Sequence, residues 1–307
     1  MKHFRLLCCC AIAAITLLLT SCESGYTAPS KDTANCTITF TASGTPTRTG
    51  EAVPEGSPEG QPSTRAAVAI GDCFSKLNLM LFNPDGTRYF SQVRTQYSTD
   101  ENFGQLSLTL PAGEYTLVAV GHSSAKSATI KSPELVQFTA SNGQKLTDTF
   151  CYAGTVTVTE TPQQHTITLV RCTAMLRFCF TDEEIPATLA RIKFDYSGGS
   201  ANVNPTTSEG TTKSTQSETR DLDPDDTYRL YTFPLLATTG TLKVTISALA
   251  ADGTVIRKQS LEAVPVTRNR ITTYTGPLFS EGGGTITQSG FGFWVDSEWD
   301  GEDRYEF

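Results

Sequence analysis

The sequence predicts an all-β protein made of β-sandwiches. Charged residues make up only 18% of the 307 residues, while Thr and Ser are frequent, a composition typical of strands and turns. Short segments that alternate apolar and polar residues recur along the chain, and Gly, Pro and Asn separate them. Almost no segment shows the period of about 3.6 residues of an amphipathic helix. Many short strands at this spacing favour sandwiches.

The chain begins with the layout of a bacterial lipoprotein signal. A basic start is followed by an apolar run, residues 6–19, and by the small residues Thr20 and Ser21 directly before Cys22. The run is shorter than the roughly twenty residues that span a bilayer, so we expect residues 1–21 to be removed as a signal peptide. Cys22 would then carry acyl chains such as palmitate and tether the protein to a membrane. An ordinary secretory signal and a retained membrane helix are the alternatives.

A stalk, a first strand and a loose loop follow the signal. Residues 22–35 are polar and rich in turn residues, as expected of a stalk, and residues 36–43 alternate and predict a strand. Residues 44–64 are crowded with Pro, Gly, Ser, Thr and Glu and have almost nothing to bury, which predicts a flexible loop. Arg48 lies in this loop and Arg65 closes it.

Regular strand signals begin after Cys73. Residues 77–82 are apolar on both faces, and the Asn-Pro-Asp-Gly sequence that ends at Gly86 predicts a turn and a hairpin. Residues 105–110 alternate cleanly, and a Pro-Ala-Gly turn leads into a strand at 114–120. We expect Leu79 and Tyr115 on buried strand faces. Further strands are predicted at residues 135–140, 154–160, 165–170 and 174–181.

The second half repeats this style without an obvious sequence repeat. Residues 197–226 form a Ser/Thr/Asp-rich stretch of about thirty residues, which predicts a functional or disordered loop. We place one sandwich at residues 36–163 and the other at 164–307. Strands of the second half are predicted at residues 190–196, 228–233, 241–249, 254–261, 270–279 and 290–296.

Charge and motifs argue against several function classes. The formal net charge is -8 and no Lys/Arg cluster occurs, so nucleic acid binding is not expected. His122 precedes two serines, but no G-x-S-x-G elbow accompanies it, and a histidine in a turn is the favoured interpretation. The metal motifs H-x-x-H and H-E-x-x-H are absent from the sequence. We therefore predict no catalytic residue, no cofactor and no enzymatic activity.

Acidic residues cluster at 221–226 and at 296–303. Their oxygens could hold calcium, but neither cluster matches a calcium-binding loop, so we expect solvated turn carboxylates and no metal. Trp294 and Trp299 flank part of the second cluster. Trp299 is a candidate ligand contact that could stack on a sugar, although a core position for at least one of the two is the default.

The cysteines leave the disulfide pairing open. With Cys22 lipidated, an odd number remains, so at least one lacks a partner within the chain, and the spacing matches no zinc framework. We expect Cys172 and Cys179 to lie on opposite strand faces and not to pair with each other. The remaining cysteines are Cys36, Cys73, Cys151, Cys172 and Cys179.

Several motifs, taken in order, resemble the fimbrillin and fimbrial-anchor superfamily of Bacteroidales, the type V pilus proteins. They are the lipobox, the segment 77–86, the Leu-Pro-Ala-Gly-Glu-Tyr-Thr-Leu-Val-Ala-Val sequence at 110–120, the Arg-Asn-Arg segment at 266–279, and 295–299. The resemblance implies two tandem transthyretin-like (Ig-like Greek-key) β-sandwiches on an outer-membrane lipid anchor, with a role in building or anchoring a fimbrium.

The resemblance also implies a maturation step. Pilins of this superfamily lose their first strand to an Arg-specific protease, which opens a groove for a neighbour's strand, whereas anchors keep the lipid and stay uncut. Arg48 and Arg65 are therefore candidate cleavage sites, and the roles of anchor, stalk subunit and tip adhesin stay open. The expected partners are fimbrial subunits bound by strand exchange, outer-membrane lipid, and a host or bacterial surface protein or glycan.

The alternative function is a surface glycan-binding lipoprotein of the outer membrane. It would use Trp299 or the segment 197–226.

Overall fold

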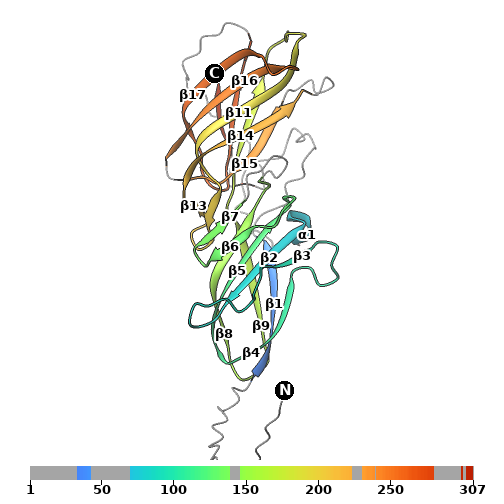
Figure 1. The fold of residues 1–307 in the computed structure, drawn as a ribbon, viewed down its shortest axis with the longest axis vertical. Coiled ribbons are helices and arrows are strands. Elements are labelled where there is room, and N and C mark those ends of the chain that lie inside the picture. Colours follow the sequence, from blue (N-terminus) through green and yellow to red (C-terminus); the bar gives the residue numbers. More distant parts are fainter. Residues whose placement is uncertain are drawn as a thin grey trace, which may run out of the picture. The chain divides into compact units, whose positions relative to one another are not determined.

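In the computed structural model the chain divides into two compact units, residues 1–31 and 32–307. All described elements lie in the second unit, and they comprise strands β1 to β19 and one four-residue helix, α1 (Ile70–Cys73). The predicted all-β class is confirmed (Figure 1). In the described part of the chain, no helix is long and apolar enough to cross a membrane. The structure describes residues 33–42, 70–138, 146–222, 230–238, 240–279, 299 and 302–306.

The first half of the unit contains a seven-stranded sheet of order β3-β2-β5-β8-β9-β1-β4. β1 (Thr33–Ala42) pairs in parallel with β9 (Gln163–Arg171) and antiparallel with β4 (Gln105–Pro111). Inward-facing side chains of the sheet form the first hydrophobic cluster, in which Leu79 is fully buried and Tyr115 is buried, as predicted. The other strands are β2 (Lys76–Phe82), β3 (Arg94–Tyr97), β5 (Gly113–His122) and β8 (Phe150–Val158).

The second half contains two four-stranded sheets, of order β15-β10-β18-β19 and β14-β11-β16-β17. Their inner faces share a second hydrophobic cluster. In it the ring of Phe178 stacks on the rings of Phe194 and Tyr274, with distances between ring centroids of 4.9 Å and 5.9 Å. Two clusters covered by sheets are consistent with tandem sandwiches. These strands are β10 (Ala174–Phe180), β11 (Leu189–Ser200), β14 (Lys213–Asp221), β15 (Leu230–Leu235), β16 (Thr241–Ala250), β17 (Val255–Pro265), β18 (Ile271–Gly276) and β19 (Glu302–Glu306).

A small sheet of order β13-β12-β7-β6 contains strands from both halves of the sequence. β12 (Asn202–Asn204) pairs with β7 (Leu135–Gln137), and Val203 belongs to the first hydrophobic cluster. The outer strands are β6 (Thr129–Ser132) and β13 (Glu209–Gly210).

The predicted loop at residues 197–226 is wrong, because β14 and parts of β11, β12 and β13 occupy most of it. β14 pairs with β11 alone and lies at the edge of its sheet. Most of its side chains are exposed or half-buried on both faces, so the sequence has no apolar alternation that would predict a strand. Backbone pairing of a Thr-rich segment needs no such alternation.

The two predicted turns have different outcomes. The Asn-Pro-Asp-Gly turn is confirmed: the Asn83 N–H donates to the Thr87 carbonyl at 2.7 Å, and Gly86 has φ 81°. The Pro-Ala-Gly turn joins β4 to β5, but these strands do not pair with each other. β5 is buried on both faces and lies between β2 and β8, whereas β4 is buried on one face beside β1. The predicted strand at 290–296 lies outside the described residues.

Candidate assembly site

β1 fills a place between two other strands and closes the first core. Its side chains alternate, so that Cys36 and Ile38 are fully buried and Phe40 is nearly so, while Thr37 and Thr39 face solvent. This alternation follows directly from the two-residue repeat of a strand with one buried face. The apolar half of β1 is therefore an integral part of the hydrophobic cluster.

Both edges of β1 are paired over most of its length. Seven of its residues pair in parallel with β9 and seven pair antiparallel with β4. Loss of β1 would leave the facing backbone groups of β9 and β4 without partners and would open an apolar groove. An exposed edge of that kind is a template for another strand. The predicted site residues Cys22, Arg48 and Arg65 lie outside the described residues.

Arg171, at the end of β9, is the centre of a buried polar cluster. Its guanidinium is 1% exposed, and its Nε donates to both carboxylate oxygens of Asp148 at 3.0 Å. Its Nη1 donates to Asn269 Oδ1 at 2.9 Å. The guanidinium also lies over the rings of Phe150, at 4.8 Å, and Trp299, at 4.0 Å. A buried charge is tolerated here because it is paired and hydrogen-bonded.

Trp299, the candidate sugar contact, is 2% exposed. It groups with Met175 and Ile271 and is covered on one side by Arg171. This burial agrees with the default expectation of a core position for at least one of the two tryptophans, and a ring in this position offers no open face to a sugar. A ligand contact at Trp299 stays a prediction that would require the ring to be uncovered.

The Arg-Asn-Arg segment before β18 connects the end of β9 with the C-terminal strand. Arg268 donates to the carbonyl of Arg171 at 2.9 Å, and Asn269, in the left-handed region at φ 59°, accepts from the Arg171 guanidinium. Arg270 donates to both oxygens of Asp303 on β19, at 3.2 and 2.7 Å. The segment therefore holds the end of the chain against the second half.

Two carboxylates of the predicted acidic cluster pair with arginines of the sheet. Glu302 is 4% exposed, pairs with Arg177 at 3.2 Å and accepts from the Thr273 hydroxyl. Asp303 pairs with Arg270. The prediction of solvated turn carboxylates is wrong for Glu302, which β19 buries beside Arg177, whereas Asp303 is paired and still about one-third exposed. Within the described ranges, no group of three His, Cys, Asp or Glu side chains could hold a metal ion.

His122 ends β5 and is fully buried, whereas the sequence favoured a histidine in a turn. Its Nε2 lies 2.8 Å from Asn78 Oδ1, and the Ser124 N–H donates to its Nδ1 at 3.1 Å. Burial, with the charge of Lys76, lowers the pKa of His122 to about 4. The neutral ring therefore has a structural hydrogen bond on each side, and the Ser124 hydroxyl lies near Thr147 instead, at 3.4 Å.

Cys36, Cys151 and Cys172 are free, buried thiols in this structure. Burial raises the pKa of Cys36 and of Cys172. The thiols of Cys151 and Cys172 hydrogen-bond to each other, which lowers the pKa of Cys151. Cys151 also contacts the hydroxyl of Ser208 at 3.4 Å. The disulfide pairing that the sequence left open stays open.

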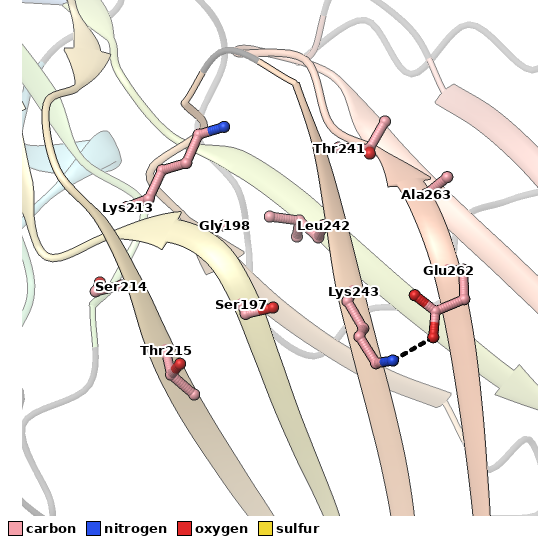
Figure 2. Close-up of a pocket in the computed structure, with 10 residues that line it drawn as sticks. All are labelled: Ser197, Gly198, Lys213, Ser214, Thr215, Thr241, Leu242, Lys243, Glu262 and Ala263. Atoms are coloured by element: carbon pink, nitrogen blue, oxygen red, sulfur yellow. Dashed lines mark ion pairs between the residues drawn. The ribbon is translucent and has the colours of Figure 1, made fainter.

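A polar hollow of about 430 Å³ opens on the sheet formed by β14, β11, β16 and β17 (Figure 2). Lys213 and Thr215 come from β14, Ser197 from β11, and the ion pair of Lys243 with Glu262 from β16 and β17. The segment 197–226, which the sequence suggested for the alternative glycan-binding function, supplies part of the lining, whereas the contribution of β16 and β17 was not predicted because no motif marks it.

Comparison with known proteins identifies the family. No curated protein matches the chain. Among solved structures, a candidate adhesin from Bacteroides ovatus is similar in fold, with 13% identity, a TM-score of 0.51, and coverage of 77% of this chain and 80% of that one.

Two further structures are more distant. The fimbrial anchor protein Mfa2 from Porphyromonas gingivalis has 12% identity and a TM-score of 0.42, covering 75% and 82% of the two chains. A fimbrial assembly protein from Parabacteroides distasonis has 13% identity and a TM-score of 0.41, covering 79% and 90%. The family model described as fimbrillin-A associated anchor proteins Mfa1 and Mfa2 matches residues 24–303. Since this match spans most of the sequence, the chain belongs to the family of fimbrillin-A associated anchor proteins.

Proposed function

We propose that this chain is a fimbrial anchor lipoprotein of the cell outer membrane that keeps its first strand and joins other fimbrial subunits by strand complementation. Family membership supports a structural, fimbrial protein of the cell surface with fimbrial subunits as partners. The observation that carries the anchor role is β1, which lies complete between β9 and β4 with its apolar side chains in the core. A subunit that polymerises through the groove of this strand would have to lose it.

Within the seven-stranded sheet, the edge of β4 is suited to receive a partner's strand. β4 contains no charged residue and alternates regularly, whereas the edge strands β14 and β17 carry charges and pair through bulges. Charged and bulged edges resist strand addition, and a regular uncharged edge favours it. Within the described strands, β4 pairs with β1 alone.

The backbone groups available on this edge can be assigned. The Gln96 side chain donates to the Gln105 carbonyl at 2.6 Å from the far side of β4. Because backbone groups of alternate residues point to alternate sides, those of Ser107 and Thr109 face the same edge. A partner's strand would pair there with the backbone, while its side chains alternate between core and solvent.

Charge placed on this edge tests the proposal. Ser107→Lys adds an exposed charge on β4, and Thr37→Lys adds the same charge on β1 directly opposite, where the strand is paired on both sides. We expect Ser107→Lys to lose the fimbrial subunits that co-purify with the wild-type protein and Thr37→Lys to retain them. Equal retention by both variants would contradict complementation at β4.

The state of the N-terminus tests the anchor role. We expect protein recovered from cells to begin with a blocked, lipidated Cys22 and to remain uncut at Arg48 and Arg65. A free N-terminus at Ala66 would contradict the anchor role, because cleavage there discards both β1 and Cys22. N-terminal sequencing and mass spectrometry distinguish the two outcomes.

Removal of the acylated thiol tests the lipid anchor itself. We expect Cys22→Ala to leave a folded protein that no longer fractionates with membranes. Retention of this variant in the membrane pellet after a high-salt wash would show that the lipid-anchor hypothesis is wrong.

A further inference from the structure

The hollow shown in Figure 2 lies where the pairing of its sheet is irregular. The register of β11 against β14 shifts between Ser197 and Gly199, and the register of β16 against β17 shifts between Leu242 and Val244. Bulges of this kind frequently occur next to functional sites, where they redirect side chains. The volume of about 430 Å³ is within the range of small-ligand sites, about 300 to 1,000 Å³.

The backbone at the hollow is strained at one residue and adopts a glycine conformation at another. Ala263, which lines it, has φ 58°, a conformation that residues with a Cβ rarely adopt. Gly198 on the opposite side has φ 103°, and a Cβ there would lie 3.0 Å from the Thr241 carbonyl oxygen. Backbone strain of this kind clusters at binding sites and is held in place by the surrounding structure.

Two charged side chains at the hollow form an ion pair with each other, and a third does not. Lys243 and Glu262, both exposed, form an ion pair at one side of the hollow (Figure 2). Lys213, which is exposed, has no hydrogen-bond or ion-pair partner within the described residues. Figure 2 shows its ammonium group at the opposite side of the hollow from the ion pair. The site thus has one available positive charge, that of Lys213. On its other side, the carboxylate of Glu262 can accept hydrogen bonds.

We propose that this hollow binds an acidic polysaccharide, with the carboxylate of a uronic acid unit paired to Lys213. The hydroxyls of Ser197, Thr215 and Thr241 and the Glu262 carboxylate suit the sugar hydroxyls, because they provide donors and acceptors around the ring. No aromatic side chain lines the hollow, so a neutral sugar would lack a stacking surface and the charge has to supply the affinity. A peptide would need apolar pockets, but the apolar side chains that line the hollow are Leu242, which is 3% exposed, and the small Ala263.

This binding function is independent of strand complementation. The hollow lies on β14, β11, β16 and β17, whereas the proposed assembly edge lies on β4. Loss of one activity therefore leaves the other measurable, and the two proposals can fail separately.

Titration calorimetry with oligomers of galacturonic, glucuronic and mannuronic acid tests the proposal, with their methyl esters as uncharged controls. We expect at least one acid to bind and its ester not to bind, with affinity falling as salt is raised. Lys213→Met keeps the aliphatic stem and removes the charge, and we expect it to lower the affinity about tenfold or more. Lys258→Met is the matched control on β17, outside the hollow, and should leave binding unchanged.

Nitrogen-15 NMR places the ligand. We expect the amide signals of Gly198 and Ala263 to shift on addition of the binding oligosaccharide, in the wild type and in Lys258→Met. The proposal is overturned if no uronic acid oligomer binds, if acid and ester bind equally, if Lys213→Met binds as the wild type does, or if an acidic peptide binds at these amides in place of the sugar.

Discussion

β1 and β10 occupy corresponding places in the two halves of the molecule. β1 pairs in parallel with β9, the last strand of the first half, and antiparallel with β4. β10 pairs in parallel with β18 and antiparallel with β15. Each half thus inserts its first strand beside a later one in the same way, although the sequences show no repeat.

The two strands differ in how they are covered. β1 has one buried face, and its other face consists of exposed or half-buried polar residues, four threonines and Asn35. β10 is covered on both faces: Leu176 and Phe178 enter the core, while Met175 packs with Trp299 and Arg177 pairs with Glu302. Release of β1 would therefore disrupt one packed face, whereas release of β10 would disrupt two.

The connections of the two strands differ as well. β10 follows β9 after only a short link, and the buried cluster around Arg171 holds that link. β1 is joined to α1 by the long segment that contains Arg48 and Arg65. The first strand of the first half is therefore joined to the rest of its sheet by a long connection, whereas the first strand of the second half follows a short link held by a buried cluster.

Truncation of Arg171 should have the largest effect on this arrangement. Arg171→Ala leaves the largely buried carboxylate of Asp148 without its ion-pair partner and removes the support of Trp299. Loss of one partner of a buried pair costs about 3 to 5 kcal/mol, and we expect a decrease of that size in the free energy of unfolding. Denaturant titration measures this decrease, and the variant Arg257→Ala, changed at an exposed position, serves as the control. A decrease below about 1 kcal/mol would show that the cluster does not hold the link.

A matched pair of leucines tests whether the halves unfold separately. Leu79 on β2 and Leu176 on β10 are both fully buried, in the first and second hydrophobic clusters. Each change to Ala should cost about 2 to 5 kcal/mol. If the halves are independent units, Leu79→Ala lowers hydrogen-exchange protection in the first half alone and Leu176→Ala in the second alone.

The boundary between the halves depends on this result. The division after residue 163 stays a prediction, and β9, which begins there, contributes Ile167 and Leu169 to the first cluster. Equal loss of protection in both halves from either leucine variant would show one cooperative unit.

Strands with one buried face could be predicted closely from the sequence. The expected strand at 105–110 matches β4 within one residue, because its leucines alternate with polar residues. β14 could not be predicted, because neither of its faces is consistently buried. The pair of Arg171 with Asp148 joins residues 23 positions apart, and a fully buried arginine is rare enough that composition does not suggest it.

Protonation of His122 should destabilise the first half in acid. Its folded-state pKa of about 4 lies below the ordinary value of 6.5, so the unfolded chain binds the proton first as the pH falls. The stability from the neutral ring is complete above about pH 6.5 and is lost progressively toward pH 4, by about 3 kcal/mol in total. Both described histidines lie in the first half, so the second half should lack this loss.

His122→Gln separates this effect from the protonation of carboxylates. The variant should show a smaller decrease in the free energy of unfolding between pH 6.5 and 4 than the wild type. Parallel pH profiles for the two proteins, measured by denaturant titration, would contradict the assignment.

The smallest effect is expected at the end of the chain. Arg270 and Asp303 join β18 to β19 through two hydrogen bonds, but both side chains are about one-third exposed. Exposed ion pairs contribute about 0 to 1 kcal/mol, so Arg270→Ala should change the global free energy of unfolding by less than about 1 kcal/mol. Local exchange of the β19 amides should nevertheless become faster, because the strand has β18 as its one neighbour within the described sheet. Faster exchange confined to β19 would show that the C-terminal strand opens independently of the rest of its sheet. A global loss as large as that of Arg171→Ala would instead show that β19 is part of the cooperative core, and the difference between the coverage of β1 and that of β10 would become sharper still.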